Sequence, residues 1–462
     1  MSNAFIKQLS HIVDSKSLLT DPTECLTYGY DNSRRQSQPL AVIFPVTETQ
    51  VQQTVLACNQ HKIALIARGR GTGTTGATVP TKNELIISFE RMNKIISIDI
   101  NNRSMDVQPG VTNQQVQQYA AQHNLFWAPD PTSAAFCSIG GNLAYNSAGP
   151  RAVKYGTCRE NTLGLRAVTG NADIIKCGTY TTKGVVGYDL TRLIIGSEGN
   201  LALITQASLK LLPLPETSHT IKASYNSVDA AARAVSSIMS QSIIPCALEF
   251  MDKNALDMVR DYSSVKLPDN AAAMLMIEVD GHSTTIEHAS AQVINACKVE
   301  GHIDTQLAHT KEEARALWQT RKALSPSLRK IAPKKINEDV VVPVSHIPAL
   351  INGLDQLSKQ HQIKIVNFGH AGNGNIHVNL LVNPDNKAEM QAAEKCLGDV
   401  FDLVLSLNGS LSGEHGVGLE KRDYIGRELG ETELDLMRGI KQVFDKNSIL
   451  NPGKTLPSAQ NT

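Results

Sequence analysis

Two histidines at the ends of a short glycine-rich segment are the residues of this sequence best suited to metal chemistry. His370 and His377 enclose Ala-Gly-Asn-Gly-Asn-Ile, and apolar runs precede and follow them. The two glycines disfavour a helix, whereas an apolar run, an Asn/Gly turn and a second apolar run predict a β-hairpin. Pairing across that turn would place His370 nearly opposite His377, with Cβ atoms about 5 Å apart. Two imidazoles at that separation can share one divalent metal ion.

An acid and a base stand side by side in a second glycine-rich loop, at residues 409–418. Glu414 is a suitable third ligand for Zn²⁺ or a similar ion, with one coordination position left open. His415 is suited to general-base catalysis, because an unperturbed histidine has a pKa of about 6.5. The alternative is that each histidine is an ordinary surface or core residue. Two histidines across a hairpin neck, together with a neighbouring Glu-His pair, favour a site.

Five polar turn segments, four of them containing glycine, offer backbone N–H groups to an extended ligand. They are residues 68–76, 129–133, 138–142, 146–150 and 196–200. The first contains a literal G-x-G-x-x-G pattern, but a proline follows closely, so the helix that a nicotinamide-dinucleotide site requires is not expected. Its successive N–H groups favour an anion-binding nest instead. The alternative is a plain surface turn.

The elements that must position these residues follow an α/β pattern. We expect strands at residues 40–45, 63–67, 84–89, 95–100, 105–107, 192–195, 201–205, 273–279 and 363–367. We expect helices beginning after Thr47 and at residues 113–123, 228–240 and 285–300. Residues 129–170 show few helix signals and predict a long functional segment without regular structure. The closely spaced prolines at residues 212–216 predict a linker between two domains.

Composition narrows the class of protein. The chain has 462 residues, equal numbers of basic and acidic residues, and eight cysteines. Its length predicts two domains, and the balanced charge without a basic block argues against nucleic-acid binding. None of the cysteines forms a C-x-x-C pair, which argues against a zinc ribbon or an iron–sulfur cluster. With no signal peptide or membrane span in the sequence, we expect a cytoplasmic protein, with peripheral attachment to the inner membrane as an alternative.

Four of these polar turn segments together resemble the FAD-binding half of the vanillyl-alcohol-oxidase-type flavoproteins. They read Arg-Gly-x-Gly-Thr, Pro-Asp-Pro-Thr-Ser, Ile-Gly-Gly-Asn-Leu-Ala and Gly-Ser-Glu-Gly-Asn-Leu. Within that superfamily the sequence is most similar to the FAD-linked D-2-hydroxy-acid dehydrogenases, namely D-lactate dehydrogenase, D-2-hydroxyglutarate dehydrogenase and the flavin-binding subunit of glycolate oxidase. The resemblance implies an α+β fold. A PCMH-type FAD-binding domain of two α/β subdomains would occupy residues 1–215, an α/β cap domain residues 216–410, and a segment returning to the FAD domain residues 411–462.

The resemblance also implies which residues bind FAD. The expected contacts are Arg68, Gly69, Arg70, Gly71, Thr72, Gly73, Thr74, Pro131, Thr132, Ser133, Gly140, Gly141, Asn142, Asn146, Glu198, Gly199, Ile204 and Asn451. We expect noncovalent FAD, because the first turn holds no nucleophile for the flavin 8α-carbon. Cys158 is the alternative attachment point, although a small buried thiol is the commoner role. The family pattern further makes His370, His377 and Glu414 ligands of a divalent metal, with zinc favoured, and His415 the catalytic base.

A 2-hydroxy acid needs a cation for its carboxylate, and the planar fork of arginine is preferred. The segment Trp-Gln-Thr-Arg resembles the family's Trp-x-x-Arg, so Arg321 is the expected substrate-binding and catalytic residue, with Ser325 one helical turn later as its helper. Arg329 and Lys335 are competing cations. The family's lysine in the following segment is Asn337 here, and this departure argues against a second substrate carboxylate.

The expected reaction is the FAD-dependent oxidation of a D-2-hydroxy acid, D-lactate favoured, to the 2-oxo acid. His415 would deprotonate the metal-assisted hydroxyl, and hydride would pass to flavin N5. The alternatives are D-2-hydroxyglutarate as substrate, a flavin subunit of a glycolate oxidase complex, and an oxygen-using oxidase. Without haem-attachment or cluster cysteines, the chain is expected to deliver electrons to an acceptor protein, a quinone or a cytochrome. The sequence leaves open whether the chain forms a homodimer.

Overall fold

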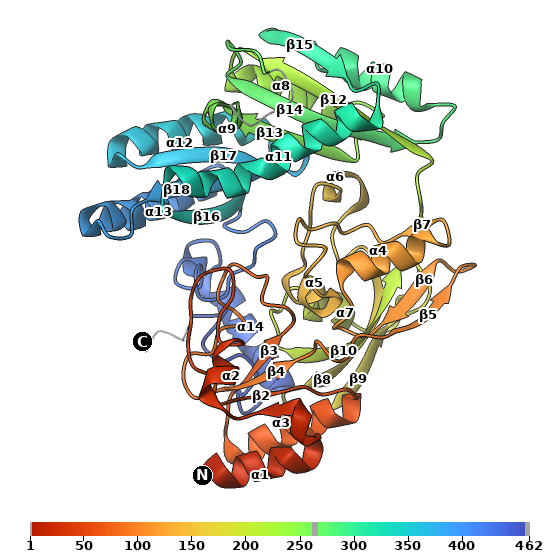
Figure 1. The fold of residues 1–462 in the computed structure, drawn as a ribbon, viewed down its shortest axis with the longest axis vertical. Coiled ribbons are helices and arrows are strands. Elements are labelled where there is room, and N and C mark those ends of the chain that lie inside the picture. Colours follow the sequence, from red (N-terminus) through yellow and green to blue (C-terminus); the bar gives the residue numbers. More distant parts are fainter. Residues whose placement is uncertain (1, 261–266, 458–462) are drawn as a thin grey trace. The chain divides into compact units, whose positions relative to one another are not determined.

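The structure, a computed structural model, describes residues 2–260 and 267–457, without the side chains of residues 2, 325, 326 and 329–331. The chain forms two compact units (Figure 1). The first comprises Met1–Gly149, Gly156–Leu214 and Glu414–Thr462, and the second comprises Pro150–Tyr155 and Pro215–Gly413.

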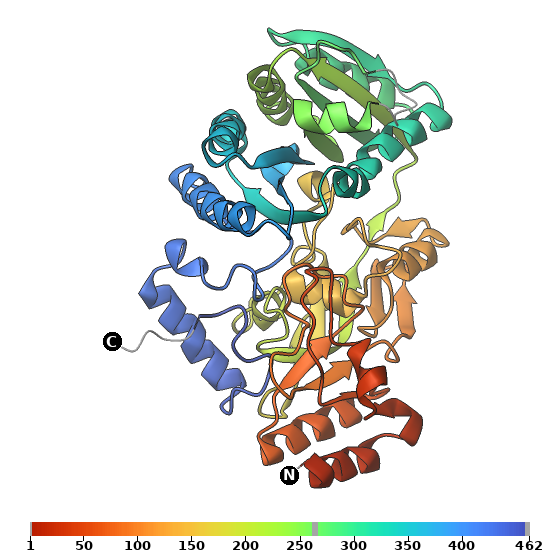
Figure 2. The same cartoon turned by 60° about the vertical axis from the view of Figure 1, so that its left-hand side comes forward.

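A mostly parallel sheet of four strands forms one half of the first unit. Its order is β1 (Leu18–Leu19), β2 (Ala41–Ile43), β4 (Leu85–Ser88), β3 (Leu65–Arg68), with only β1 antiparallel. Every residue of β2 and β4 is buried, as expected where both faces of a parallel sheet are covered. The helices α1 (Ser2–Ile12) and α3 (Glu48–His61) lie side by side and pack on one face (Figure 2). The short helix α2 (Pro22–Leu26) contributes Cys25 to the core on the other face.

An antiparallel sheet of five strands forms the other half of the first unit. Its order is β5 (Ile95–Asp99), β6 (Ser104–Val107), β10 (Ala202–Lys210), β8 (Thr162–Thr169), β9 (Ile174–Gly178). The helices that pack on it are α4 (Asn113–Ala121), α5 (Ile139–Tyr145) and α7 (Leu190–Ile194). A small pair, β7 (Leu125–Phe126) with β11 (Leu212–Pro213), and the late helix α14 (Glu431–Phe444) complete the unit.

Two predictions for this region are wrong. Residues 192–195 belong to α7 and its C-cap, not to a strand, because the Asp189 side chain caps a helix there by accepting the N–H of Arg192. Residues 129–170 contain α5 and most of β8, so the segment is not without regular structure. Ser138 caps α5 in the same way, and side-chain capping makes such short helices stable within a packed fold.

The second unit is built on an antiparallel sheet of seven strands. Its order is β15 (His302–Leu307), β12 (Thr217–Tyr225), β14 (Ala273–Gly281), β13 (Ala247–Asp252), β17 (Lys364–His370), β18 (Asn375–Val382), β16 (Lys334–Val341). The helices of this unit are α6 (Ala152–Tyr155), α8 (Val228–Met239), α9 (Lys253–Val259), α10 (Ile286–Ala296), α11 (Lys311–Ile331), α12 (Ile347–His361) and α13 (Lys387–Ser406).

Two helices, α9 and α11, cover one face of this sheet. The helices α9 and α11 share a core with Met251, Met276 and Phe368, which point to one face of the sheet.

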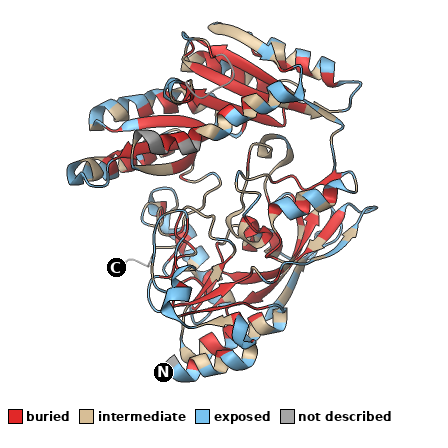
Figure 3. Ribbon diagram, in the orientation of Figure 1, coloured by how far each residue is buried: buried red, intermediate tan, exposed pale blue. Residues whose placement is uncertain are grey.

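The strands of both units are largely buried, whereas the outward sides of the helices are exposed (Figure 3). Within the described ranges no helix combines the length and the apolar character that crossing a membrane requires.

Candidate functional site

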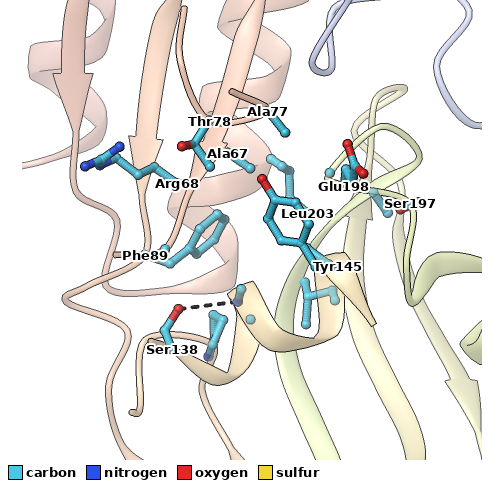
Figure 4. A pocket seen from close by; sticks show the side chains of 18 of the residues that line it. Ala67, Arg68, Ala77, Thr78, Phe89, Ser138, Tyr145, Ser197, Glu198 and Leu203 are labelled. Carbon is cyan, nitrogen blue, oxygen red and sulfur yellow. Dashed lines mark hydrogen bonds between the residues drawn. The ribbon is translucent and has the colours of Figure 1, made fainter. Parts of the chain in front are cut away.

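A cleft in the first unit is lined by residues of both of its sheets and of α5 (Figure 4). Counted to its open mouth, with the solvent there included, it contains about 590 Å³ of space free of protein atoms. Its walls are mostly apolar or small. The lining residues are Ala67, Arg68, Gly69, Ala77, Thr78, Phe89, Pro109, Ser138, Gly140, Gly141, Ala144, Tyr145, Ile194, Ser197, Glu198, Gly199, Ala202, Leu203 and Ile204.

Two glycines keep part of this lining as bare backbone. A Cβ at Gly69 would lie 2.4 Å from Ser138 Oγ, and a Cβ at Gly140 would lie 2.6 Å from Pro109 Cβ. Neither position therefore accepts a side chain without displacing its neighbour. The same Ser138 hydroxyl accepts the N–H of Gly141 at 3.3 Å and caps α5 (Figure 4). The two turns thus meet closely and present backbone to the cleft.

The Arg68 side chain packs against the first turn, at Gly71. Its guanidinium donates to the carbonyl of Tyr30 at 2.7 Å, and the glycine at position 71 leaves room for it, since a Cβ there would lie 2.3 Å from Arg68 Nη2. Burial lowers the pKa of Arg68, while the carboxylate of Asp31 opposes that shift. Arg68 therefore links the start of the turn to Tyr30, in addition to lining the cleft.

Two hydroxyls in the cleft are suited to bind a ligand. Thr78 Oγ1 and Ser197 Oγ are buried and have no hydrogen-bond partner among the described residues, although buried polar atoms are normally paired. The Tyr145 side chain lies between Thr78 and Glu198 in the view of Figure 4. Burial, with the charge of Glu198 second, raises the pKa of Tyr145 and keeps its hydroxyl protonated. Apolar walls, unpaired hydroxyls and bare backbone fit a flat, extended ligand such as FAD.

The expected FAD contacts divide into two groups. Those that line the cleft are Arg68, Gly69, Gly140, Gly141, Glu198, Gly199 and Ile204. Those that are not part of this lining, and for which FAD contact stays a prediction, are Arg70, Gly71, Thr72, Gly73, Thr74, Pro131, Thr132, Ser133, Asn142, Asn146 and Asn451.

The three asparagines of the second group hold loops together. Asn142 accepts from Asn113 Nδ2 at 3.3 Å. Asn146 ends α5 with a left-handed backbone, and its side-chain oxygen accepts the N–H of Arg159 at 3.0 Å. Asn451 donates to the carbonyl of Glu198 at 2.9 Å. Each therefore shapes the backbone around the cleft.

Cys158 lies in the core beneath the five-stranded sheet rather than in the cleft. It is fully buried among the residues that pack on this sheet. Burial raises its pKa well above the ordinary value of a thiol. A protonated, enclosed thiol is a poor nucleophile, which agrees with the expectation of noncovalent FAD.

Glu198 fixes the loop that carries His415 within the first unit. Its carboxylate accepts the N–H of Val417 at 2.6 Å and the N–H of Gly418 at 2.9 Å. Burial raises the pKa of Glu198, opposed by these hydrogen bonds. A Cβ at Gly416 would lie 2.7 Å from the Tyr145 ring, so the residue after His415 packs directly on a side chain of the cleft. The expected base thus lies on a loop that is held against the cleft.

The histidine hairpin of the second unit is formed by β17 and β18, joined by a short 3-10 turn, Ala371–Asn373. Its register differs from the expected one in detail. His370 pairs with Asn375, and His377 pairs with Phe368, so the two histidines are diagonal neighbours, not opposite each other. The turn contains four residues, where direct His370–His377 pairing would require six, so the pairing is shifted by two residues. The side chains still share one face, with ring centroids 5.2 Å apart.

A buried carboxylate stands behind the first histidine. Glu249 on β13 lies directly opposite His370 in the β13–β17 register, and its Oε1 is 2.5 Å from His370 Nδ1. Its Oε2 accepts from Arg321 Nε at 2.8 Å and from Nη2 at 2.7 Å. Burial alone would raise the pKa of Glu249, but its interactions with His370 and Arg321 outweigh burial and lower the pKa. Arg321 is thus already paired on one edge.

A second carboxylate lies opposite the second histidine. Asp339 on β16 pairs in register with His377. Its Oδ2 accepts the N–H of Gly413 at 2.9 Å, and its Oδ1 accepts the hydroxyl of Ser412 at 3.2 Å. Asp339 therefore fixes the chain immediately before Glu414. Glu414 itself opens the last segment of the first unit, and its role as a third ligand stays a prediction.

Two further residues, Asn337 and Ser325, are expected to contact the substrate. Asn337 lies on β16 directly opposite Asn379, on the same sheet face as His377. Asn379 is fully buried, and its Oδ1 has no partner among the described residues. Ser325 belongs to α11, but its side chain lies outside the described ones.

Sequence reasoning missed Glu249, Asp339 and Asn379. A signal existed for the first two, because each is an acid inside or beside an apolar run (Ala-Leu-Glu-Phe-Met and Glu-Asp-Val-Val-Val). Charged residues in buried strands require partners. Which partners they have depends on strand order, which no local pattern reveals.

Comparison with known families and proteins gives one consistent result. Residues 214–455 match the family described as "FAD linked oxidases, C-terminal domain", and residues 39–178 match "FAD binding domain". The chain is 40% identical to glycolate oxidase subunit GlcD of Bacillus subtilis (strain 168), over 93% of this chain and 92% of that protein.

Two further relatives carry other names. The chain is 32% identical to a D-2-hydroxyglutarate dehydrogenase of Stutzerimonas stutzeri (strain A1501), with 98% of each chain covered. It is also 32% identical to a D-lactate dehydrogenase of Anaerostipes hadrus, over 97% of this chain and 96% of that one. Among solved structures, p-cresol methylhydroxylase with substrate bound has the same fold, with a TM-score of 0.80 at 17% identity, over 100% of this chain and 98% of that one.

Proposed function

Because this chain belongs to the FAD-linked oxidoreductases of the GlcD, D-lactate dehydrogenase and D-2-hydroxyglutarate dehydrogenase type, we propose that it oxidises a D-2-hydroxy acid to the 2-oxo acid. D-lactate is the favoured substrate. The observation that carries the proposal is the pair of histidines on one sheet face, one of them bonded to a carboxylate that also holds an arginine.

FAD would be held without a covalent bond in the cleft of the first unit. The backbone at Gly69, Gly140 and Gly199 would approach it, while the hydroxyls of Thr78 and Ser197 would gain partners. Tyr145 and the apolar walls would cover its flat ring system. Bound there, FAD would accept the two electrons of the oxidation.

A divalent metal, zinc favoured, would be held by His370, His377 and Glu414. Two imidazoles and one carboxylate form the donor set of many catalytic zinc sites, which leave one position open. The pairing of His370 with Glu249 supports this assignment, since metal-binding histidines usually donate their other N–H to a carboxylate. When bound, the metal would act as a Lewis acid toward the substrate hydroxyl.

Residues of the chain itself would bind the substrate carboxylate and remove the hydroxyl proton. The free edge of Arg321, including Nη1, would hold the substrate carboxylate, while its other edge stays on Glu249. His415 would remove the hydroxyl proton, from a loop that Glu198 holds against the cleft. The unpaired Oδ1 of Asn379 would accept a hydrogen bond from a ligand on the same sheet face.

The choice of substrate rests on one residue and on the names of the relatives. Asn337, in place of a lysine, favours a small acid such as D-lactate over a substrate with a second carboxylate. Relatives named as a glycolate oxidase subunit support glycolate as a second candidate, and with it a role inside a larger complex. In either role the electrons would pass to a partner protein, a quinone or a cytochrome.

A dye-reduction screen tests this proposal. Purified chain with bound FAD would be offered D-lactate, L-lactate, glycolate and D-2-hydroxyglutarate with an artificial electron acceptor. We expect turnover with D-lactate and little with L-lactate, loss of turnover in His415→Asn, and normal turnover in His288→Asn, a histidine on the exposed side of α10. No turnover with any of the acids would refute the proposal for the isolated chain, and peroxide formation would identify an oxidase.

A further inference from the structure

We propose that Glu249 is the positioning residue of the metal site: it fixes the tautomer of His370 so that the ring offers the lone pair of Nε2 to the metal. The inference rests on the proposed function, because it requires His370 to be a metal ligand. It assigns a role to a residue that lies 121 positions away in the sequence from the histidine that it contacts.

Each oxygen of Glu249 has a separate partner. Oε1 is 2.5 Å from His370 Nδ1, while Oε2 accepts both donors of the near edge of Arg321. An ionised carboxylate only accepts hydrogen bonds, so His370 Nδ1 must carry the proton. In the neutral ring, the lone pair is then on Nε2. The carboxylate thereby selects the form of the histidine that can bind a metal through Nε2.

The sheet itself enforces this contact. Glu249 and His370 are register partners on neighbouring strands, so their side chains leave the same face at the same level. Glu249 is only 1% exposed, and water does not compete for its oxygens. Because regular strands hold both residues, the orientation of the imidazole is set before a metal arrives.

A buried carboxylate in this sheet can also orient a loop or neutralise a buried arginine, and both roles differ from positioning a histidine. Asp339 stands in register with His377, but both of its oxygens accept hydrogen bonds from the Ser412–Gly413 segment, so it orients that segment. Alternatively, Glu249 could serve only as the partner that neutralises buried Arg321. That role predicts loss of stability on substitution, but it predicts no specific effect on metal affinity once the arginine is also removed.

The first test replaces Glu249 by glutamine. The amide oxygen would remain with Arg321, which offers only donors, so the NH₂ group would face His370 Nδ1. That nitrogen would become the acceptor and the ring proton would move to Nε2. Zinc titration calorimetry on the full FAD-containing chain, stripped with a chelator, should show affinity weakened by about 10- to 100-fold, the range for such outer partners.

A matched control and a double variant separate positioning from stability. Asp252→Asn removes another buried carboxylate of the same strand, which caps α9 and bonds Asn367, and it should leave zinc affinity unchanged. Glu249→Met combined with Arg321→Met removes both the hydrogen-bond acceptor of His370 and the unpaired buried charge, and it keeps the fold if Glu249→Gln alone unfolds. Zinc binding should remain weak in the double variant. Wild-type affinity there would overturn the inference and leave a purely structural ion pair.

One further variant distinguishes this inference from the proposed function. His370→Ala should abolish the tight zinc site. If wild-type protein binds no zinc, or if His370→Ala binds it as wild type does, the metal site of the proposed function is wrong. If His370→Ala loses zinc but Glu249→Gln and the double variant bind it normally, the proposed function stands and the role of Glu249 is wrong.

Discussion

Replacing Arg321 by lysine tests whether one guanidinium serves two carboxylates. In the structure Nε and Nη2 bond Glu249 at 2.8 and 2.7 Å, and the guanidinium lies over the Phe368 ring with its carbon 4.8 Å from the centroid. This geometry leaves Nη1 for a substrate. A lysine keeps the charge, but its single ammonium cannot reproduce a planar fork. We expect it to stay on Glu249 and to lose the substrate carboxylate.

The expected decrease in kcat/KM follows from the one contact that is lost, between Arg321 and the substrate carboxylate. A hydrogen bond to a charged group contributes about 1.5–3 kcal/mol. At about 1.36 kcal/mol per tenfold change, kcat/KM should fall by about 10- to 150-fold. Steady-state dye reduction by the FAD-containing chain measures it.

The methyl ester of the same 2-hydroxy acid is the control substrate. The ester has no carboxylate, so wild type and Arg321→Lys should use it equally poorly. A variant within about twofold of wild type on the acid would refute the reasoning, because the loss of even a weak charged contact exceeds that. Equal losses on acid and ester would indicate damage to the fold.

Three further predictions concern the cofactor and one buried carboxylate. Gly140→Ala should lower the ratio of flavin to protein after purification, because its Cβ would lie 2.6 Å from Pro109 Cβ. The control Gly439→Ala on α14, where a Cβ meets nothing within 4 Å, should retain full flavin. Equal flavin in both variants would contradict the assignment of the cleft as the FAD site. Burial raises the pKa of Asp252 to about 6, against about 3.9 in an unfolded chain. Relative to Asp252→Asn, the wild type should therefore lose about 3 kcal/mol of its free energy of unfolding as the pH rises from about 4 to 6. If urea denaturation shows the same pH dependence for both proteins, the pKa shift is absent. Acid precipitation should release FAD into the supernatant, since Cys158 is enclosed in the core, whereas a yellow pellet would point to covalent attachment.

Much of the fold could be predicted from local patterns. The expected strands at residues 63–67, 84–89 and 273–279 correspond to β3, β4 and β14, and the expected helix at 228–240 is α8. Apolar periodicity and capping residues act within a few positions of the chain, so the sequence shows them directly. The short helix α7 escaped prediction because two of its five residues, Thr191 and Ile194, are β-branched and also suit a strand.

The candidate site was predictable only where its residues are close in sequence. His370 and His377 share a hairpin, and their proximity follows from the turn between them. Glu249 reaches His370 through the order of strands in the seven-stranded sheet. That order depends on long-range packing, and no spacing in the sequence encodes it. The same holds for the hydrogen bonds of Glu198 to the backbone after His415, across 219 and 220 positions.

The central claim is that a metal held by the histidine hairpin enables oxidation of a 2-hydroxy acid by bound FAD. The most direct measurement follows the visible absorbance of the flavin, without oxygen, after D-lactate is added to chelator-treated protein and then to the same protein supplied with Zn²⁺. We predict that the metal-free protein keeps its FAD and does not bleach, and that Zn²⁺ restores bleaching with one pyruvate formed per flavin. Equally fast bleaching in rigorously metal-free protein would contradict the account.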